Sequence, residues 1–180
     1  MQRAIDRLCM ASTQRRQPLA PVHEWPETLA GEPWCFSPEL VSLHGTPEFE
    51  ALDVVAQKRL SFFEAVNFFS LNIHGERFLV EGLAARLYRP GHELVSRYLH
   101  HFLEEENNHM TWFGGFCQRY AGKVSASKKL GLEREYEPGE EDFLFFARAV
   151  VFEEIVDVYN RRMASDERLA PLAREINAVH

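Results

Sequence analysis

Residues His92 to Tyr120 have the sequence HELVSRYLHHFLEEENNHMTWFGGFCQRY, and this stretch decides the fold class. Its apolar residues recur every three or four positions, which is the period of a helix with one buried face. The glycine after Ala121 is a common helix stop. The apolar face comprises Leu99, Phe102, Leu103, Met110, Phe113 and Phe116, and Glu106 and His109 interrupt it. The stretch therefore predicts a long helix with two ionisable groups on its core face.

Glu106 and His109 form a Glu-x-x-His unit. Side chains three residues apart on a helix project side by side, so this carboxylate and imidazole can bind one metal ion. Glu105, four residues before His109, is the alternative carboxylate ligand. Its neighbours on the helix face, His101 and Asn108, are more polar than those of Glu106, so Glu106 is the preferred ligand. Because a single Glu-x-x-His often occurs by chance, the hypothesis depends on further acids at the same depth.

Further helices are expected on both sides of this stretch. Thr46 and Pro47 have the form of an N-cap followed by a first-turn proline, which predicts a short helix. Ser61 and Glu64 fit a capping box, which predicts the start of a long helix. The predicted helices cover residues 46–58, 61–88, 140–164 and, as a short stub, 169–180. No alternating strand pattern competes with this all-α interpretation.

Two more acids interrupt apolar stripes in these helices. Glu76 lies in the stripe of the 61–88 helix and Glu153 in that of the 140–164 helix, where Glu154 is the competing choice. Glu76, Glu106 and Glu153 each fall within two residues of the middle of their helix. Carboxylates buried at one level repel each other unless a cation lies between them. Carboxylate and imidazole ligands without thiolate favour iron or manganese over structural zinc.

The first 45 residues are expected to be irregular. Five prolines break any helical period there, and the first 16 residues are expected to form a loose leader. The predicted organisation is an irregular N-terminal segment, 1–45, wrapped on a helical bundle, 46–180, whose fourth long helix is cut short.

Composition limits the partners and the compartment. The net charge of −7, without a block of lysine or arginine, argues against nucleic acid and favours a small molecule. The N-terminus lacks an apolar run long enough for a signal peptide or membrane span, so no membrane partner is expected. Three cysteines at no ligand spacing predict no disulfide framework, and a cytoplasmic location is expected.

The acids and histidine resemble the ligand pattern of ferritin-like di-iron proteins. More narrowly, they resemble the arylamine N-oxygenase family typified by p-aminobenzoate N-oxygenase. That family's signature is a glutamate, a long spacer and then acid-Glu-x-x-His; here 28 residues separate Glu76 from Glu105, which begins the second part. The family also has a glutamate on its third helix, an acid and a proline in the following turn, and an additional histidine ligand. In this chain, the residues that resemble these positions are Glu153, Asp166, Pro171 and His180. The resemblance extends from about Phe36 to the end of the chain.

The resemblance implies a centre of two iron ions, with manganese as an alternative. Its implied ligands are Glu76, Glu106, His109, Glu153 and His180. Glu106 and Glu153 would bridge or flank the ions, and Glu76 and His109 would be terminal ligands. Asp157, one turn after Glu153, would accept a hydrogen bond from a ligating histidine and fix its tautomer.

The implied function is an oxygenase that uses O2 and an external electron donor to oxidise a small substrate, by N-oxygenation of an arylamine. A hydroxylase, oxidase or desaturase of the same fold, or a non-enzymatic metal-binding helical protein, are the alternatives. A homodimer is the assembly that we consider.

The chain departs from the family pattern at its end. The family has a glutamate four residues and a histidine seven residues beyond the position that His180 resembles. Glu175 cannot replace them, because five residues rotate it about 140° from His180 around a helix. We therefore expect either a truncated form, inactive as it stands, or an incomplete second iron site.

Overall fold

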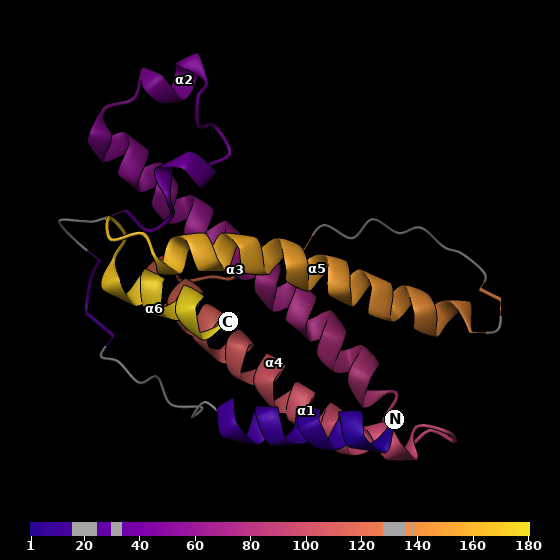
Figure 1. Ribbon diagram of the computed structural model, residues 1–180. Helices are drawn as coiled ribbons and strands as arrows, with labels where there is room; N and C mark the ends of the chain where they lie inside the picture. The colour runs from indigo at the N-terminus through magenta and orange to yellow at the C-terminus, as the bar shows by residue number, and fades with distance from the viewer. Residues whose placement is uncertain (16–24, 30–33, 128–135, 138) are drawn as a thin grey trace.

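The computed structural model describes residues 1–15, 25–29, 34–127, 136–137 and 139–180. Apart from an isolated bridge between Trp34 and Leu169, the regular elements in these residues are helices. The bundle is built from α3 (Val54–Ala84), α4 (Glu93–Ala121), α5 (Glu140–Ala164) and the short α6 (Pro171–Val179) (Figure 1). The all-α prediction is confirmed, and the arrangement is consistent with a ferritin-like bundle.

The bounds of α4 and α5 lie within one residue of those expected. Gly122 ends α4 with a φ of 69°, a left-handed conformation that glycine adopts without strain. The short helix expected over 46–58 begins as expected, because the Thr46 hydroxyl accepts a hydrogen bond from the Phe49 amide at 3.2 Å. Its expected end is wrong, since this helix, α2, covers only Pro47–Glu50.

The expected start of the long helix at Ser61 is wrong. Asp53 caps α3 by accepting a hydrogen bond from the Ala56 amide at 2.8 Å, so the helix begins at Val54. The Ser61 hydroxyl instead donates to the Lys58 carbonyl and accepts from the Cys35 amide. Glu64, the other residue of the expected capping box, accepts a hydrogen bond from the Ser42 amide. Both residues therefore make tertiary contacts and do not cap a helix.

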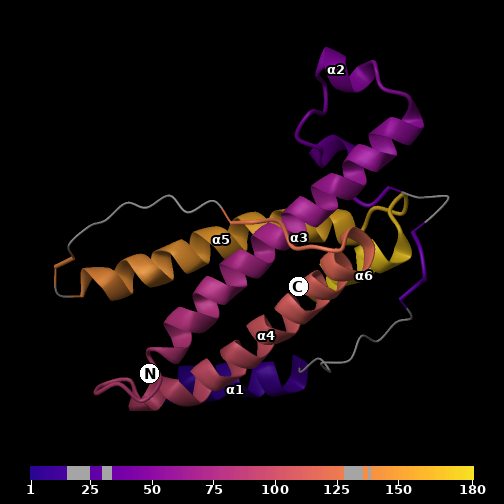
Figure 2. The ribbon, with the colours of Figure 1, turned by 180° about the vertical axis from the view of Figure 1, so that it is seen from behind.

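The expectation of an irregular N-terminus is wrong for Gln2–Arg15, which form helix α1. Ile5, Cys9 and Ser12 follow helical spacing and are buried, which gives α1 a face that packs on α4. Figures 1 and 2 both show α1 lying along α4. An ion pair of 2.7 Å between Asp6 and Arg97 also joins the two helices.

The segment around Trp34 is fastened to the turn between α5 and α6. The Ala170 amide donates to the Trp34 carbonyl at 2.7 Å, and the Trp34 amide donates to the Arg168 carbonyl at 3.2 Å. Arg168 also pairs with Glu39 at 2.6 Å and with Asp166 at 2.8 Å. We call Glu39, Asp166 and Arg168 the clamp; it fixes the turn from which α6 starts.

Two buried apolar clusters form the core. The larger contains Phe69, Phe113 and Val156, and the smaller contains Leu79 and Ala149 among others. Along α3, α4 and α5, the candidate ligands lie between the residues of these two clusters. Among the described residues, no helix combines the length and hydropathy needed to cross a bilayer.

Candidate metal centre

The structure brings together all five residues expected as ligands. Glu76 comes from α3, Glu106 and His109 from α4, Glu153 from α5, and His180 follows the last residue of α6. They form two overlapping groups, Glu76 with His109 and His180, and Glu76 with Glu106 and Glu153. Within each group, ligand atoms of the three side chains all lie within 4.8 Å of one another. We call this cluster the centre.

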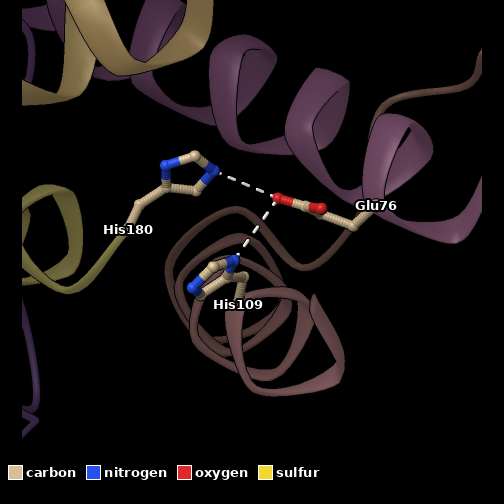
Figure 3. Close-up of side chains that lie close together, drawn as sticks. All are labelled: Glu76, His109 and His180. Carbon is tan, nitrogen blue, oxygen red and sulfur yellow. Dashed lines mark hydrogen bonds and ion pairs between the residues drawn. The ribbon is translucent and has the colours of Figure 1, made fainter. Parts of the chain in front are cut away.

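Glu76 lies in the middle of the centre. Its Oε1 is 3.1 Å from Nε2 of His180 and 3.6 Å from Nδ1 of His109, and Figure 3 shows both imidazoles directed at this oxygen. Nδ1 of His109 is also 3.2 Å from Oε2 of Glu106, and Nε2 of His180 is 3.8 Å from Oε2 of Glu153. Glu76 therefore belongs to both groups.

The carboxylates of the centre are buried without enough partners. Glu76 is 0% exposed and Glu106 is 3% exposed. Oε2 of Glu76 and Oε1 of Glu153 are buried and have no hydrogen-bond partner among the described residues. A buried oxygen without a partner costs free energy, and a bound cation would remove that cost.

Burial strongly raises the pKa of two acids in the centre, Glu106 and Glu153. It raises the pKa of Glu106; the neighbouring Glu76 raises it further, against the opposing effect of His109. Burial, together with the charges of Glu106 and Glu76, raises the pKa of Glu153 to about 8. Without a metal ion, these two carboxyls therefore retain protons at neutral pH.

The two histidines have opposite pKa shifts. Burial acts to lower the pKa of His109, but its hydrogen bonds to Glu106 and Glu76 outweigh burial and raise it. Burial and the nearby His109 charge lower the pKa of His180 to about 4. His180 is thus a neutral imidazole at neutral pH, which is the form that binds a metal ion.

The donor set fits the metal expected from the sequence. Three carboxylates and two imidazoles offer oxygen and nitrogen without thiolate, which suits iron or manganese. The two partnerless carboxylate oxygens and the two groups that share Glu76 fit a pair of ions better than a single hydrogen-bonded network.

The two acids considered as alternative ligands, Glu154 and Glu105, are not among the groups that form the centre. Glu154 is exposed, whereas Glu153 joins the centre. Glu105 is a wall residue of a neighbouring cavity. Asp157 pairs with Arg161 and is 40% exposed, and no described hydrogen bond joins it to a histidine. The expected role of Asp157 in orienting a histidine therefore has no contact to support it.

The sequence reasoning missed a close approach of α3 and α5 beside the centre. A Cβ added at Gly75 would lie 2.0 Å from the ring of Phe152, and one at Gly82 would lie 2.0 Å from the ring of Phe145. Both glycines and both phenylalanines are seven residues apart, so each pair recurs two helical turns along the contact. Gly75 precedes Glu76 and Phe152 precedes Glu153, so one pair directly adjoins two candidate ligands.

Comparison with known proteins found one matching protein family. The model of one protein family, described as P-aminobenzoate N-oxygenase AurF, matches residues 1–180, which is the whole chain. Neither the curated proteins nor the solved structures gave a match.

Proposed function

The chain belongs to the p-aminobenzoate N-oxygenase family, a family of di-iron enzymes, and from this premise we propose that it is an oxygenase acting on the nitrogen of a small aromatic amine. The buried centre carries the proposal, because its acids outnumber the protein's own cations there. Glu76, Glu106, His109, Glu153 and His180 would hold iron. Bound iron would supply the redox chemistry that activates O2.

The proposed reaction needs an outside reductant. The amine nitrogen gains one oxygen atom of O2 and the other leaves as water, so forming a hydroxylamine consumes two electrons and two protons. We propose an external electron donor as their source.

The residues around the centre have definable tasks. Glu76 sits where both histidines can orient it, through contacts of 3.1 Å and 3.6 Å to one oxygen. Phe113 and Leu79 are buried in the two flanking clusters and make the two sides of the centre along the helices apolar. The carboxyls of Glu106 and Glu153 would release their protons as a cation takes their place.

Elemental analysis of the purified chain after anaerobic loading with Fe²⁺ tests the metal part of the proposal. We expect bound iron in the wild-type protein, loss of iron in Glu106→Ala, and unchanged iron in Glu154→Ala, which removes an exposed acid from the same region. Iron content unaffected by Glu106→Ala would contradict the ligand assignment.

Product analysis tests the reaction. Iron-loaded protein is incubated with p-aminobenzoate or aniline, a reductant and O2, and products are identified by mass and by retention against N-hydroxy and nitro standards. Oxygen on nitrogen is the expected result. Oxygen on ring carbon would instead identify a hydroxylase, and iron binding without any product would leave a metal-binding protein.

A further inference from the structure

A continuous series of aromatic rings joins the centre to the surface. Starting from His180, neighbouring ring centroids lie 5.0 to 5.8 Å apart, and the series passes in turn through Phe113, Phe69, Phe116 and Tyr120. The ring of Tyr120 then stacks on that of Trp25 at 6.3 Å. The three phenylalanines are buried, whereas Tyr120 and Trp25 are partly exposed. We call these three phenylalanines, Tyr120 and Trp25 the aromatic chain.

Trp112 is the tryptophan of α4 beside the centre. Its ring lies 6.0 Å from that of His109, and it is buried. Trp112, Phe116 and Tyr120 follow one another at intervals of four residues, so they share one face of α4. By helical rise, Trp112 and Tyr120 are about 12 Å apart along the helix axis. One face of α4 thus carries a tryptophan at the centre and a tyrosine towards the surface.

The outer end of the aromatic chain is held by contacts of its own. The Tyr120 hydroxyl donates to the Pro26 carbonyl at 2.8 Å, and Arg119 donates to the carbonyls of Trp25 and Pro26. A Cβ added at Gly115 would lie 2.9 Å from the ring of Trp25, so this glycine lets the ring pack directly on α4. These contacts fix the stacked pair of Trp25 and Tyr120 at the surface end of the chain.

The order of residue types suits the transfer of single electrons. Tyrosine and tryptophan lose one electron more readily than the other aromatic side chains, and both residue types lie between the centre and the surface. The phenylalanines fill the space between them with packed atoms, through which an electron tunnels more readily than through a gap. A site that activates O2 needs such a supply, because oxidising equivalents that meet no substrate attack the protein.

We propose that Trp112 and the aromatic chain carry single electrons from the surface to the centre, and that an external one-electron donor delivers them at Tyr120 and Trp25. The proposal rests on the proposed oxygenase function and adds to it the place where electrons enter. Once O2 has oxidised the iron-loaded centre, Trp112 gives one electron to it and recovers one from Tyr120. Tyr120 releases its phenol proton to solvent as it loses the electron. The donor then returns the electron and solvent returns the proton, so no side chain is consumed.

Freeze-quench electron paramagnetic resonance tests the role of Tyr120. The Fe²⁺-loaded chain is mixed with O2 without amine or reductant, and we expect a tyrosyl radical whose signal narrows when the tyrosine rings are deuterated. Tyr120→Phe keeps the ring and removes the hydroxyl, and it should lower the signal at least fivefold. Tyr88→Phe is the matched control, because Tyr88 is 70% exposed and its ring packs against His100 beyond the end of α3. Iron content should be equal in the three proteins.

Two outcomes of this experiment would overturn the proposal. One is a wild-type protein without an aromatic radical, and the other is a tyrosyl signal that Tyr120→Phe leaves unchanged. Ascorbate, a small one-electron donor, should remove the wild-type signal, and a signal that persists with ascorbate would reject Tyr120 as the entry point.

Variants of Trp112 test the inner step. Trp112→Phe keeps an aromatic ring that is hard to oxidise, and the tyrosyl signal should appear at least tenfold more slowly. Trp112→Tyr restores an oxidisable ring and should recover most of the rate, which a purely structural role of the indole would not explain. Thermal unfolding checks that both variants are folded. Equal rates in the wild type and both variants would reject Trp112 as a relay.

The failure of this proposal can be separated from failure of the proposed function. N-oxidised product that forms equally in wild-type, Tyr120→Phe and Trp112→Phe protein, without any aromatic radical, would keep the function and reject the route. A Tyr120 radical in protein that forms no N-oxidised product would keep the route and reject the N-oxygenase.

Discussion

The clamp and the centre both gather carboxylates, but the two regions shift the pKa of an acid in opposite directions. In the clamp, the guanidinium of Arg168 hydrogen-bonds to Asp166 and lowers its pKa to about 2. In the centre, burial and neighbouring acids raise the pKa of Glu153 to about 8. The clamp lies partly in solvent, with Arg168 49% exposed, whereas Glu76 in the centre is fully buried.

The difference lies in the source of the compensating charge. Arg168 reaches Glu39 and Asp166 with hydrogen bonds of 2.6 to 2.8 Å, so the protein supplies the clamp's cation itself. In the centre, the raised pKa of His109 provides one positive charge, so Glu106 and Glu153 keep protons instead of ionising, and two carboxylate oxygens stay without a partner among the described residues. A set of buried acids that the protein leaves undercompensated is therefore the signature of an external cation.

The largest expected effect is that of Glu76→Gln, because Glu76 belongs to both ligand groups. Loss of a residue that merely supports a ligand lowers metal affinity by about 10- to 100-fold, so loss of this shared ligand should cost at least about 100-fold. Mn²⁺ titration followed by electron paramagnetic resonance measures the affinity. Glu39→Gln in the clamp is the matched control and should leave Mn²⁺ affinity unchanged. A similar loss of affinity in both variants would mean that the centre has no special relation to metal.

The second prediction concerns pH. The folded pKa of Glu153 is raised above the ordinary glutamate value of 4.5, so in the metal-free protein this group contributes stability at low pH that is lost as pH rises through about 8. Metal competes with the same proton, so the Glu153 carboxyl alone should make Mn²⁺ affinity rise about tenfold per pH unit between pH 6 and 8.

Calorimetric titrations in two buffers of different ionisation enthalpy measure the protons released on binding. We expect release at pH 7 in the wild type and less release in Glu153→Gln. Binding that releases no protons at pH 7 would show that the acids of the centre are already ionised without metal.

The third prediction distorts the centre without changing its charge. Gly75→Ala places a Cβ 2.0 Å from the ring of Phe152, next to two candidate ligands. Overpacking costs about 1–3 kcal/mol, and here it should also separate Glu76 from Glu153 and lower Mn²⁺ affinity about tenfold. Gly82→Ala makes the same contact with Phe145, two turns away, and should lower thermal stability while keeping Mn²⁺ affinity.

Phe152→Leu provides a further check in the Gly75→Ala background. The smaller side chain should restore part of the Mn²⁺ affinity by making room for the added methyl group. Equal affinity loss in the two glycine variants would show that the α3–α5 contact affects only stability.

Much of the bundle was predictable because the pattern is local. Helix α5 has the expected bounds, since three acids follow Gly139 in its first turn and Ala164 precedes a turn. The acids at Glu76, Glu106 and Glu153 were recognisable because each interrupts an apolar stripe. Their convergence followed from equal depth along helices of similar length.

Other features depend on partners that a sequence does not name. The sequence did not predict helix α1, because its buried face is small and includes the polar residue Ser12. Only its contact with α4 shows which of its residues form that face. The capping-box interpretation of Ser61 failed because Asp53 already caps the helix upstream, and the Ser61 hydroxyl instead accepts a hydrogen bond from the amide of Cys35, which is distant in the sequence. The role of Gly75 likewise depends on the register of α5 against α3, which places Phe152 over it.

The smallest expected effect belongs to the clamp. Arg168→Met removes the cation from Glu39 and Asp166, and because the clamp is half exposed we expect a loss of only about 1–2 kcal/mol of unfolding free energy near pH 6. The pKa of Asp166 is lowered from 3.8 to about 2, so its contribution is present above pH 3.8 and is lost as pH falls through about 2. The difference between wild type and variant in urea unfolding should therefore shrink as pH falls from 6 to 2.

Arg161→Met, which removes a cation from the exposed pair with Asp157, should cost less than about 0.5 kcal/mol. A clamp variant that lowers Mn²⁺ affinity as much as stability would mean that the clamp, through the start of α6, holds His180 in the centre, and the two regions would then be coupled.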